Sequence, residues 1–292
     1  MIDEAIFCKN NISGVGLGLR HQHFKNFIED KPNVPWLEIH TENYFALGSP
    51  PSKHLEKIRR DYPISAHSIG MSLGSASTNC SIRKEHLKKI KATIDYFEPS
   101  LVSDHLSWST SEEKIYLPDL LPIPYTQEAF DIFAENINYV QNFLNRQILI
   151  ENPSAYISYK NSNINEWEFL SSLAKKTGCG ILLDINNIFV SSYNHDFDAE
   201  NYLEQIPVNI VKEMHLAGFE AKKVEGQDVL IDTHSRPVYE PVWDLYKKAA
   251  KKFANTPTLI EWDNDIPDLD ILLEEKNKAE KIINIINKNK AA

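Results

Sequence analysis

The chain has 292 residues, of which 42% are hydrophobic and 25% are charged, and its formal net charge is −10 at pH 7. This composition is typical of a folded protein with a sizeable core, and we expect a single domain over residues 1–292. The negative charge disfavours a protein that depends on general attraction to nucleic-acid phosphates.

Cysteines and targeting signals narrow the class of protein further. Cys8, Cys80 and Cys179 are odd in number, far apart and in no CxxC pair, so neither a disulfide framework nor a thiolate zinc site is indicated. No apolar run approaches the ~18 residues that a membrane-spanning helix needs. The first residues also lack the pattern of a signal peptide. We therefore expect a cytoplasmic protein with no membrane partner.

Short apolar runs predict eight strands, and most of the gaps between them predict helices. The predicted strands are 14–20, 36–44, 64–70, 101–108, 148–154, 180–187, 211–218 and 258–265. The predicted helices are 84–97, 126–144, 165–178, 241–253 and 270–288. Asn165 and Glu168 have the spacing of a capping box, and Gly178 has the position of a left-handed helix cap.

Alternation of strand and helix over roughly 250 residues is the pattern of a (β/α)₈ TIM barrel. A doubly wound sheet has the same alternation but usually fewer strands, and it remains the alternative. No linker or internal repeat divides the chain. We predict an α/β, TIM-barrel-like single domain that ends in a helix.

Potential metal ligands stand at the carboxyl end of nearly every predicted strand, which is the end that carries the active site in such barrels. In chain order they are Glu38, His40, Glu42, Asn43, His67, Asp104, His105, Glu151, Asn152, Asp184, Asn186, Asn187, His215, Glu261 and Asp263. The long connection before the last strand adds Asp232 and His234, whose spacing puts both side chains on one face of an extended segment.

One such residue alone is more often a hydrogen-bonded core histidine or a helix-capping aspartate than a ligand. A whole constellation is different, because buried carboxylates raise one another's pKa and are costly to desolvate unless cations neutralise them. Histidine, aspartate and glutamate without cysteine suit iron, zinc or manganese. The number of candidate ligands predicts a cluster of two or three metal ions.

Eight motifs that contain these residues also carry a resemblance to a known family. In order they are LEIHTENYF, AHSIGMSLG, SDHLSW, IENPSAY, LLDINNIFVSSYNHDFD, EMHLAGF, IDTHSRPVYEPVW and TLIEWDNDIP. From Gly14 to Pro267 they resemble the multinuclear non-haem iron-dependent oxidase family, which contains the iron subunit of methanobactin biosynthesis. The resemblance implies an oxidoreductase with two or three iron ions, in mixed Fe(II)/Fe(III) states. Such an enzyme uses O₂ to modify cysteines of a ribosomally made precursor peptide.

The resemblance also implies roles for individual residues. Glu151 is expected to be shared between two irons, with Asp184, His215 and Glu261 completing one of the two sites. Of these four ligands, Glu151, Asp184 and His215 are the expected catalytic residues. Members of the family usually act with a second protein that presents the leader peptide, so a heterodimeric partner is expected.

The remaining ligands are implied for two further positions. His67 and His105 are expected to hold the neighbouring iron, and Asn187, Asp232 and His234 a third, more loosely bound one. The chain departs from the family pattern after His215, where a second histidine is expected and Phe219 and Glu220 stand instead. Five further residues are expected to orient the metal-binding side chains or to face the substrate, namely His40, Glu42, Asn43, Asn186 and His195.

Two other functions remain open from the sequence. A divalent-metal hydrolase or isomerase, like apurinic endonucleases or xylose-isomerase-like enzymes, also gathers these ligands at strand ends. A protein that binds a partner and keeps its metals only for stability is the second alternative. Metal identity, dependence on O₂ and the effect of replacing Glu151 distinguish the three.

Overall fold

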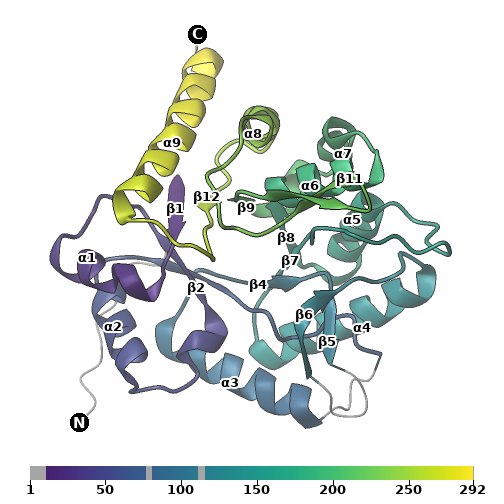
Figure 1. The fold of residues 1–292 in the computed structure, drawn as a ribbon. Coiled ribbons are helices and arrows are strands. Elements are labelled where there is room, and N and C mark those ends of the chain that lie inside the picture. The colour runs from purple at the N-terminus through teal and green to yellow at the C-terminus, as the bar shows by residue number, and fades with distance from the viewer. Residues whose placement is uncertain (1–10, 77–80, 111–115, 292) are drawn as a thin grey trace.

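The structure is a computed structural model that describes residues 11–76, 81–110 and 116–291. Eight parallel strands close into a barrel in the order β1-β2-β3-β4-β7-β8-β9-β12 (Figure 1). Their bounds are β1 Val15–Gly18, β2 Leu37–His40, β3 Ile64–His67, β4 Leu101–His105, β7 Leu149–Glu151, β8 Gly180–Asp184, β9 Val211–Leu216 and β12 Thr258–Ile260. The predicted (β/α)₈ architecture is confirmed.

Helices surround the barrel on its outside (Figure 1). They are α1 Phe24–Glu29, α2 Pro50–Arg59, α3 Ser81–Phe97, α4 Gln127–Leu144, α5 Glu166–Thr177, α6 Ile185–His195, α7 Ala199–Gln205, α8 Glu240–Lys252 and α9 Leu269–Ala291. The five predicted helices are all present, with ends that differ by up to three residues. The predicted capping box of α5 is also present, and Gly178 ends that helix with φ of 73°.

Short elements occupy the connections at the carboxyl end of the barrel. The two-stranded sheets are β5 Trp108–Thr110 with β6 Tyr116–Leu121, and β10 Glu220–Val224 with β11 Gln227–Ile231. The 3₁₀ turns at this end are η1 His21–His23 and η2 Thr41–Tyr44, whereas η3 Val208–Ile210 comes directly before β9 at the amino end. Several predicted strands are too long because their polar ends leave the sheet and enter these turns or the next helix.

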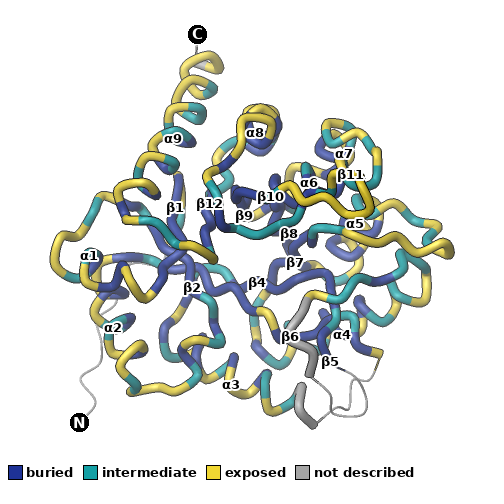
Figure 2. Tube along the Cα trace, viewed as in Figure 1, coloured by how far each residue is buried: buried dark blue, intermediate teal, exposed yellow. Residues whose placement is uncertain are grey.

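The strands of the barrel are almost entirely buried, whereas each helix alternates between buried and exposed positions along its length (Figure 2). This pattern follows from the architecture, because side chains fill the interior of a parallel barrel and helices cover its outside. The largest fully buried side chains include Trp36 and Trp243. Among the described residues, no helix combines the length and the apolarity that a bilayer-crossing segment requires.

Candidate metal centre

Strand register brings the predicted ligands together at the carboxyl end of the barrel. His105 at the end of β4 lies beside Glu151 at the end of β7. Asp184 at the end of β8 likewise lies beside His215 on β9. His67 ends β3, next to β4. Because parallel neighbouring strands end at the same edge, residues that are far apart in sequence converge on one site.

The first group consists of His67, His105 and Glu151, with one ligand atom of each within 4.8 Å of the other two. Nε2 of His67 and Nε2 of His105 each lie 3.2 Å from Oε2 of Glu151. The two imidazole nitrogens are 3.2 Å from one another. Nδ1 of His67 lies 2.7 Å from the Ser103 hydroxyl, which fixes the ring so that Nε2 faces the centre.

The second group consists of Glu151, Asp184, His215 and Glu261, again within 4.8 Å. Nδ1 of His215 lies 3.0 Å from Oε2 of Glu261 and 3.8 Å from Oε1 of Glu151. Glu151 therefore turns Oε2 towards the first group and Oε1 towards the second. A carboxylate with one oxygen facing each group is suited to bridge two metal ions.

Without a bound cation, the burial of these side chains shifts their pKa values strongly. Burial raises the pKa of Glu151 to about 8 and that of Asp184 to about 7. Burial opposes protonation of His105, but the charges of Glu151 and Asp104 outweigh it and raise the His105 pKa to about 9. Oε2 of Glu151 and Oδ2 of Asp184 are buried without a hydrogen-bond partner. Unpaired buried oxygens beside imidazoles fit divalent cations, so the donor set is compatible with a metal centre.

Asp232 and His234 lie in the connection after β11, and the fold brings them to the same mouth. Nε2 of His234 is 2.7 Å from Oδ1 of Asp232, and Nδ1 is 3.4 Å from Oε2 of Glu261. His234 has φ of 46°, which is uncommon for a residue with a side chain. Its N–H donates to the carbonyl of Gly218, and its own carbonyl accepts from the N–H of Asp263. These contacts hold the strained residue in place.

The two asparagines after β8 have different environments. Asn186 donates from Nδ2 to Oδ1 of Asp232 at 2.7 Å. Asn187 donates from Nδ2 to the carbonyl of Asn152, and its Oδ1 is buried without a partner. The N–H of Asn187 donates to Oδ1 of Asp184 at 2.6 Å. Asp184 therefore caps α6 with Oδ1, and its Oδ2 stays without a hydrogen-bond partner, so capping does not use the oxygen that a metal would need.

A second layer of acidic residues lies deeper in the barrel, and sequence reasoning missed one of its members. Glu213 was not among the predicted residues, yet it is fully buried and accepts a hydrogen bond from Ser65. Oε2 of Glu38 lies 3.1 Å from Nε2 of His215, and burial raises the pKa of Glu38 to about 7. The signal was available, because Glu213 and His215 are two apart in a strand and so share a face.

A cation within the chain balances part of the negative charge. Arg20 donates from Nε and Nη2 to Oδ1 of Asp263, and its Nη2 is 3.9 Å from Oε1 of Glu261. Nε2 of His40 is 3.2 Å from the same guanidinium. The side chains of His40 and Asp263 are 22% and 24% exposed, whereas Glu261 is 4% exposed. The centre therefore meets solvent on the side of His40 and Asp263.

Some residues in the matching motifs belong to neither ligand group. Phe219 stacks on Phe189 with centroids 5.5 Å apart, and Glu220 forms an ion pair with Arg236, so neither replaces the expected second histidine. Asp104 accepts hydrogen bonds from the backbone N–H of Met71 and of His105. Oε1 of Glu42 lies 3.0 Å from Nε2 of His86, Asn43 is exposed, and His195 Nε2 contacts the carbonyl of Ala155.

Solved structures with the same architecture include metal-containing barrels. A D-psicose 3-epimerase with D-tagatose from Clostridium cellulolyticum has a TM-score of 0.61 at 9% identity, covering 94% of this chain and 99% of that chain. A xylose isomerase-like TIM barrel protein from Mycobacterium smegmatis in complex with magnesium has a TM-score of 0.58 at 10% identity, covering 90% and 88%. At such identities the likeness concerns the fold alone.

Sequence comparison identifies much nearer relatives. A UPF0276 protein of Vibrio vulnificus is 47% identical over 269 residues, covering 92% of this chain and 91% of the relative. A UPF0276 protein of Psychromonas ingrahamii is 48% identical over 266 residues, covering 91% and 92%. Residues 14–284 match the model of the family described as RiPP precursor modification enzyme MbnB/TglH/ChrH, where RiPP denotes a ribosomally synthesised and post-translationally modified peptide. The chain therefore belongs to this family of peptide-modifying enzymes, as its motifs predicted.

Proposed function

We propose that this protein is an iron-dependent, O₂-using oxidase that modifies cysteine residues of a ribosomally made precursor peptide. The observation that carries the proposal is Glu151, whose two oxygens face two separate groups of ligands. A carboxylate in this position suits a pair of adjacent metal ions, and the family to which the chain belongs acts on precursor peptides.

The two groups offer only imidazole and carboxylate donors, which suit iron, zinc or manganese, and iron is proposed among these because the motifs resemble those of iron-dependent oxidases. Asp184, His215 and Glu261 would complete one site with Glu151, and the two histidines of the first group would hold the neighbouring ion. Asn187, Asp232 and His234 are proposed for a third and weaker position. When bound, iron would supply open coordination positions for a thiolate and for O₂, together with a change of oxidation state.

The chain's own residues would prepare the site for a peptide. His40, His234 and Asp263 line the exposed side of the centre, where a peptide cysteine would enter. Arg20 forms hydrogen bonds with Asp263 and lies near Glu261. It therefore offsets part of the negative charge on that wall. The buried layer beneath excludes water from the side opposite the entrance. A second protein that presents the leader peptide is proposed as the partner.

The test is an assay of the iron-loaded protein, prepared without oxygen and then exposed to O₂ with a cysteine-containing precursor peptide encoded beside its gene. We expect a mass change on the peptide that requires both iron and O₂. Glu151→Gln should abolish the change and lower the bound iron, whereas Glu200→Gln, at an exposed ion pair with Lys248, should retain both.

The alternative metal hydrolase or isomerase makes a different prediction. Firmly bound zinc, manganese or magnesium in place of iron, with activity indifferent to O₂, would refute the oxidase. An unmodified peptide that is nevertheless shown to bind the iron-loaded protein would also count against it. If Glu151→Gln loses metal and unfolds while no peptide reacts, the metals serve the fold, as the non-enzymatic alternative requires.

A further inference from the structure

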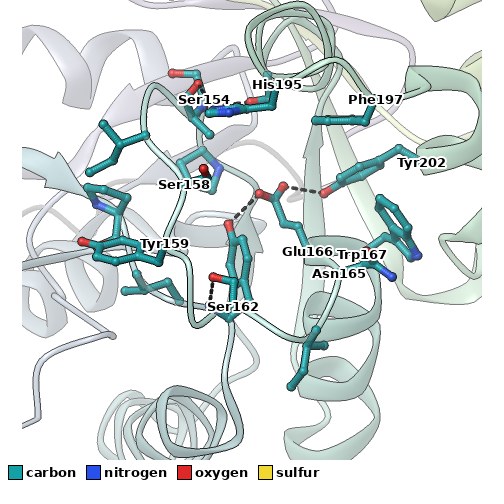
Figure 3. A pocket seen from close by; sticks show the side chains of 18 of the residues that line it. Ser154, Ser158, Tyr159, Ser162, Asn165, Glu166, Trp167, His195, Phe197 and Tyr202 are labelled. Carbon is teal, nitrogen blue, oxygen red and sulfur yellow. Dashed lines mark hydrogen bonds between the residues drawn. The ribbon is translucent and has the colours of Figure 1, made fainter.

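A cavity of about 300 Å³ lies on the same face of the barrel as the metal centre, outside the ligand groups. Its walls come from the loop between β7 and α5, the end of α6, the start of α7 and the segment after β6 (Figure 3). The volume is at the small end of the range for binding sites and suits one long side chain. The lining is mostly apolar and aromatic.

One carboxylate stands in this apolar setting. Glu166, the first residue of α5, accepts a hydrogen bond from the Tyr125 hydroxyl at 2.5 Å and another from the Tyr202 hydroxyl at 2.7 Å. Figure 3 shows the Glu166 carboxylate directed into the cavity and joined by a dashed line to the Tyr202 hydroxyl. No ion pair within the described part of the chain involves Glu166. The two donated hydrogen bonds therefore favour the ionised carboxylate, whereas burial raises its pKa, and the described residues supply no cation in an ion pair with it.

Aromatic rings complete the surroundings of this carboxylate. Trp167 packs edge-on against Tyr202 with centroids 5.6 Å apart, and Phe197 stacks on the same ring at 6.1 Å. Aromatic faces attract ammonium and guanidinium groups, and they also accept the methylene stem of a lysine or arginine. A neutral apolar ligand would instead cover an ionised carboxylate that has two hydroxyl donors but no cation, which is costly. The cavity is complementary to a long cationic side chain.

The loop that follows β7 runs from the metal centre to the cavity. Ser154 lines the cavity and donates from Oγ to Oδ2 of Asp232 at 3.3 Å. It is only three residues beyond Glu151, so their Cα atoms are at most about 11 Å apart. A peptide with one residue at the metal centre can therefore place a neighbouring side chain in this cavity.

We propose that the cavity around Glu166 binds a lysine or arginine side chain of the precursor peptide, a few residues from the cysteine that enters the metal centre. Only the identification of the ligand as part of that peptide rests on the proposed function. The complementarity to an alkylammonium or alkylguanidinium group does not depend on iron or on oxidation.

The experiment measures binding of short capped peptides to the metal-loaded protein under nitrogen, by ligand-observed NMR. The probes are acetyl-Gly-X-Gly-amide, with lysine, arginine, norleucine or glutamate at X. We expect the lysine and arginine peptides to bind about tenfold more tightly than the norleucine peptide, because norleucine matches the stem but lacks the charge. The glutamate peptide should bind least.

Two variants test whether Glu166 causes the preference for lysine over norleucine. Glu166→Gln should remove the preference for lysine over norleucine, whereas Glu128→Gln, an exposed carboxylate in the first turn of α4, should retain it. Equal binding of lysine and norleucine peptides to the native protein, or no binding at millimolar concentration, would overturn the proposal even if Glu166→Gln fails to fold. Loss of stability in that variant with an unchanged lysine preference would mean that Glu166 serves only to join its two tyrosines. Because the readout needs no turnover, failure of the oxidase assay leaves this result intact.

Discussion

In protein without bound metal ions, the free energy of unfolding should fall as the pH rises from 6 to 9. In the metal-free protein, burial raises the pKa of Glu151 to about 8 and those of Asp184 and Glu38 to about 7. The unfolded chain would ionise these carboxyls near their ordinary values. The folded state thus holds protons that the unfolded state has released, and the stability present at low pH is lost as the pH passes through the folded-state pKa values.

The magnitude can be worked from Glu151. A pKa that moves from 4.5 to about 8 corresponds to a loss of roughly 5 kcal/mol between these two pH values, of which roughly 3 kcal/mol falls above pH 6. Stability of a whole domain is only about 5–15 kcal/mol, so one such group is decisive. His105 acts in the same direction, because its raised pKa of about 9 gives stability below its ordinary value that disappears as it deprotonates.

The assay is urea unfolding followed by circular dichroism at pH 6, 7, 8 and 9, with chelator-treated and metal-loaded protein. Metal-loaded protein should show the opposite trend, because metal binding needs deprotonated ligands and becomes tighter with rising pH. Metal-free Glu151→Gln should have a shallower decline, since glutamine cannot ionise. A free energy of unfolding of the metal-free native protein that stays constant between pH 6 and 9 would refute the reasoning.

Three further changes test single contacts. Glu38→Gln should weaken metal binding about 10–100-fold in a chelator competition, because it removes the carboxylate facing Nε2 of His215; unchanged affinity would contradict that role. Asn187→Ala should reduce the metal content measured by elemental analysis by the most weakly held ion only, and loss of all metal would contradict a separate third position. Gly218→Ala should lower the thermal midpoint and release the same weak ion, because a Cβ there overlaps the backbone carbonyl of Arg236; a native midpoint and metal content would show that the loop can move aside.

Strand ends were predictable because each of them carries a local signal. The polar run that closes β8 stood out against its apolar start, and Asp184 does lie in the centre. Glu213 was missed although its spacing from His215 puts both side chains on one face of the strand, because only the closed barrel makes that face the interior. The extent of β8 was overestimated, since the hydrogen bond by which Asp184 caps α6 is a property of the folded backbone.

The amino-acid sequence by itself determined the alternation of strands and helices, the family, and the residue types that gather at the strand ends. These follow from period, capping and side-chain chemistry, which are local properties. Only the tertiary structure decided that Glu151 has one oxygen towards each ligand group and that His234 adopts a strained conformation next to Glu261. It also decided that Glu166 lies between two tyrosines from distant segments. Such pairings depend on barrel closure and strand register, which bring distant parts of the chain together. The separation of two residues in sequence does not tell how far apart they lie in the fold.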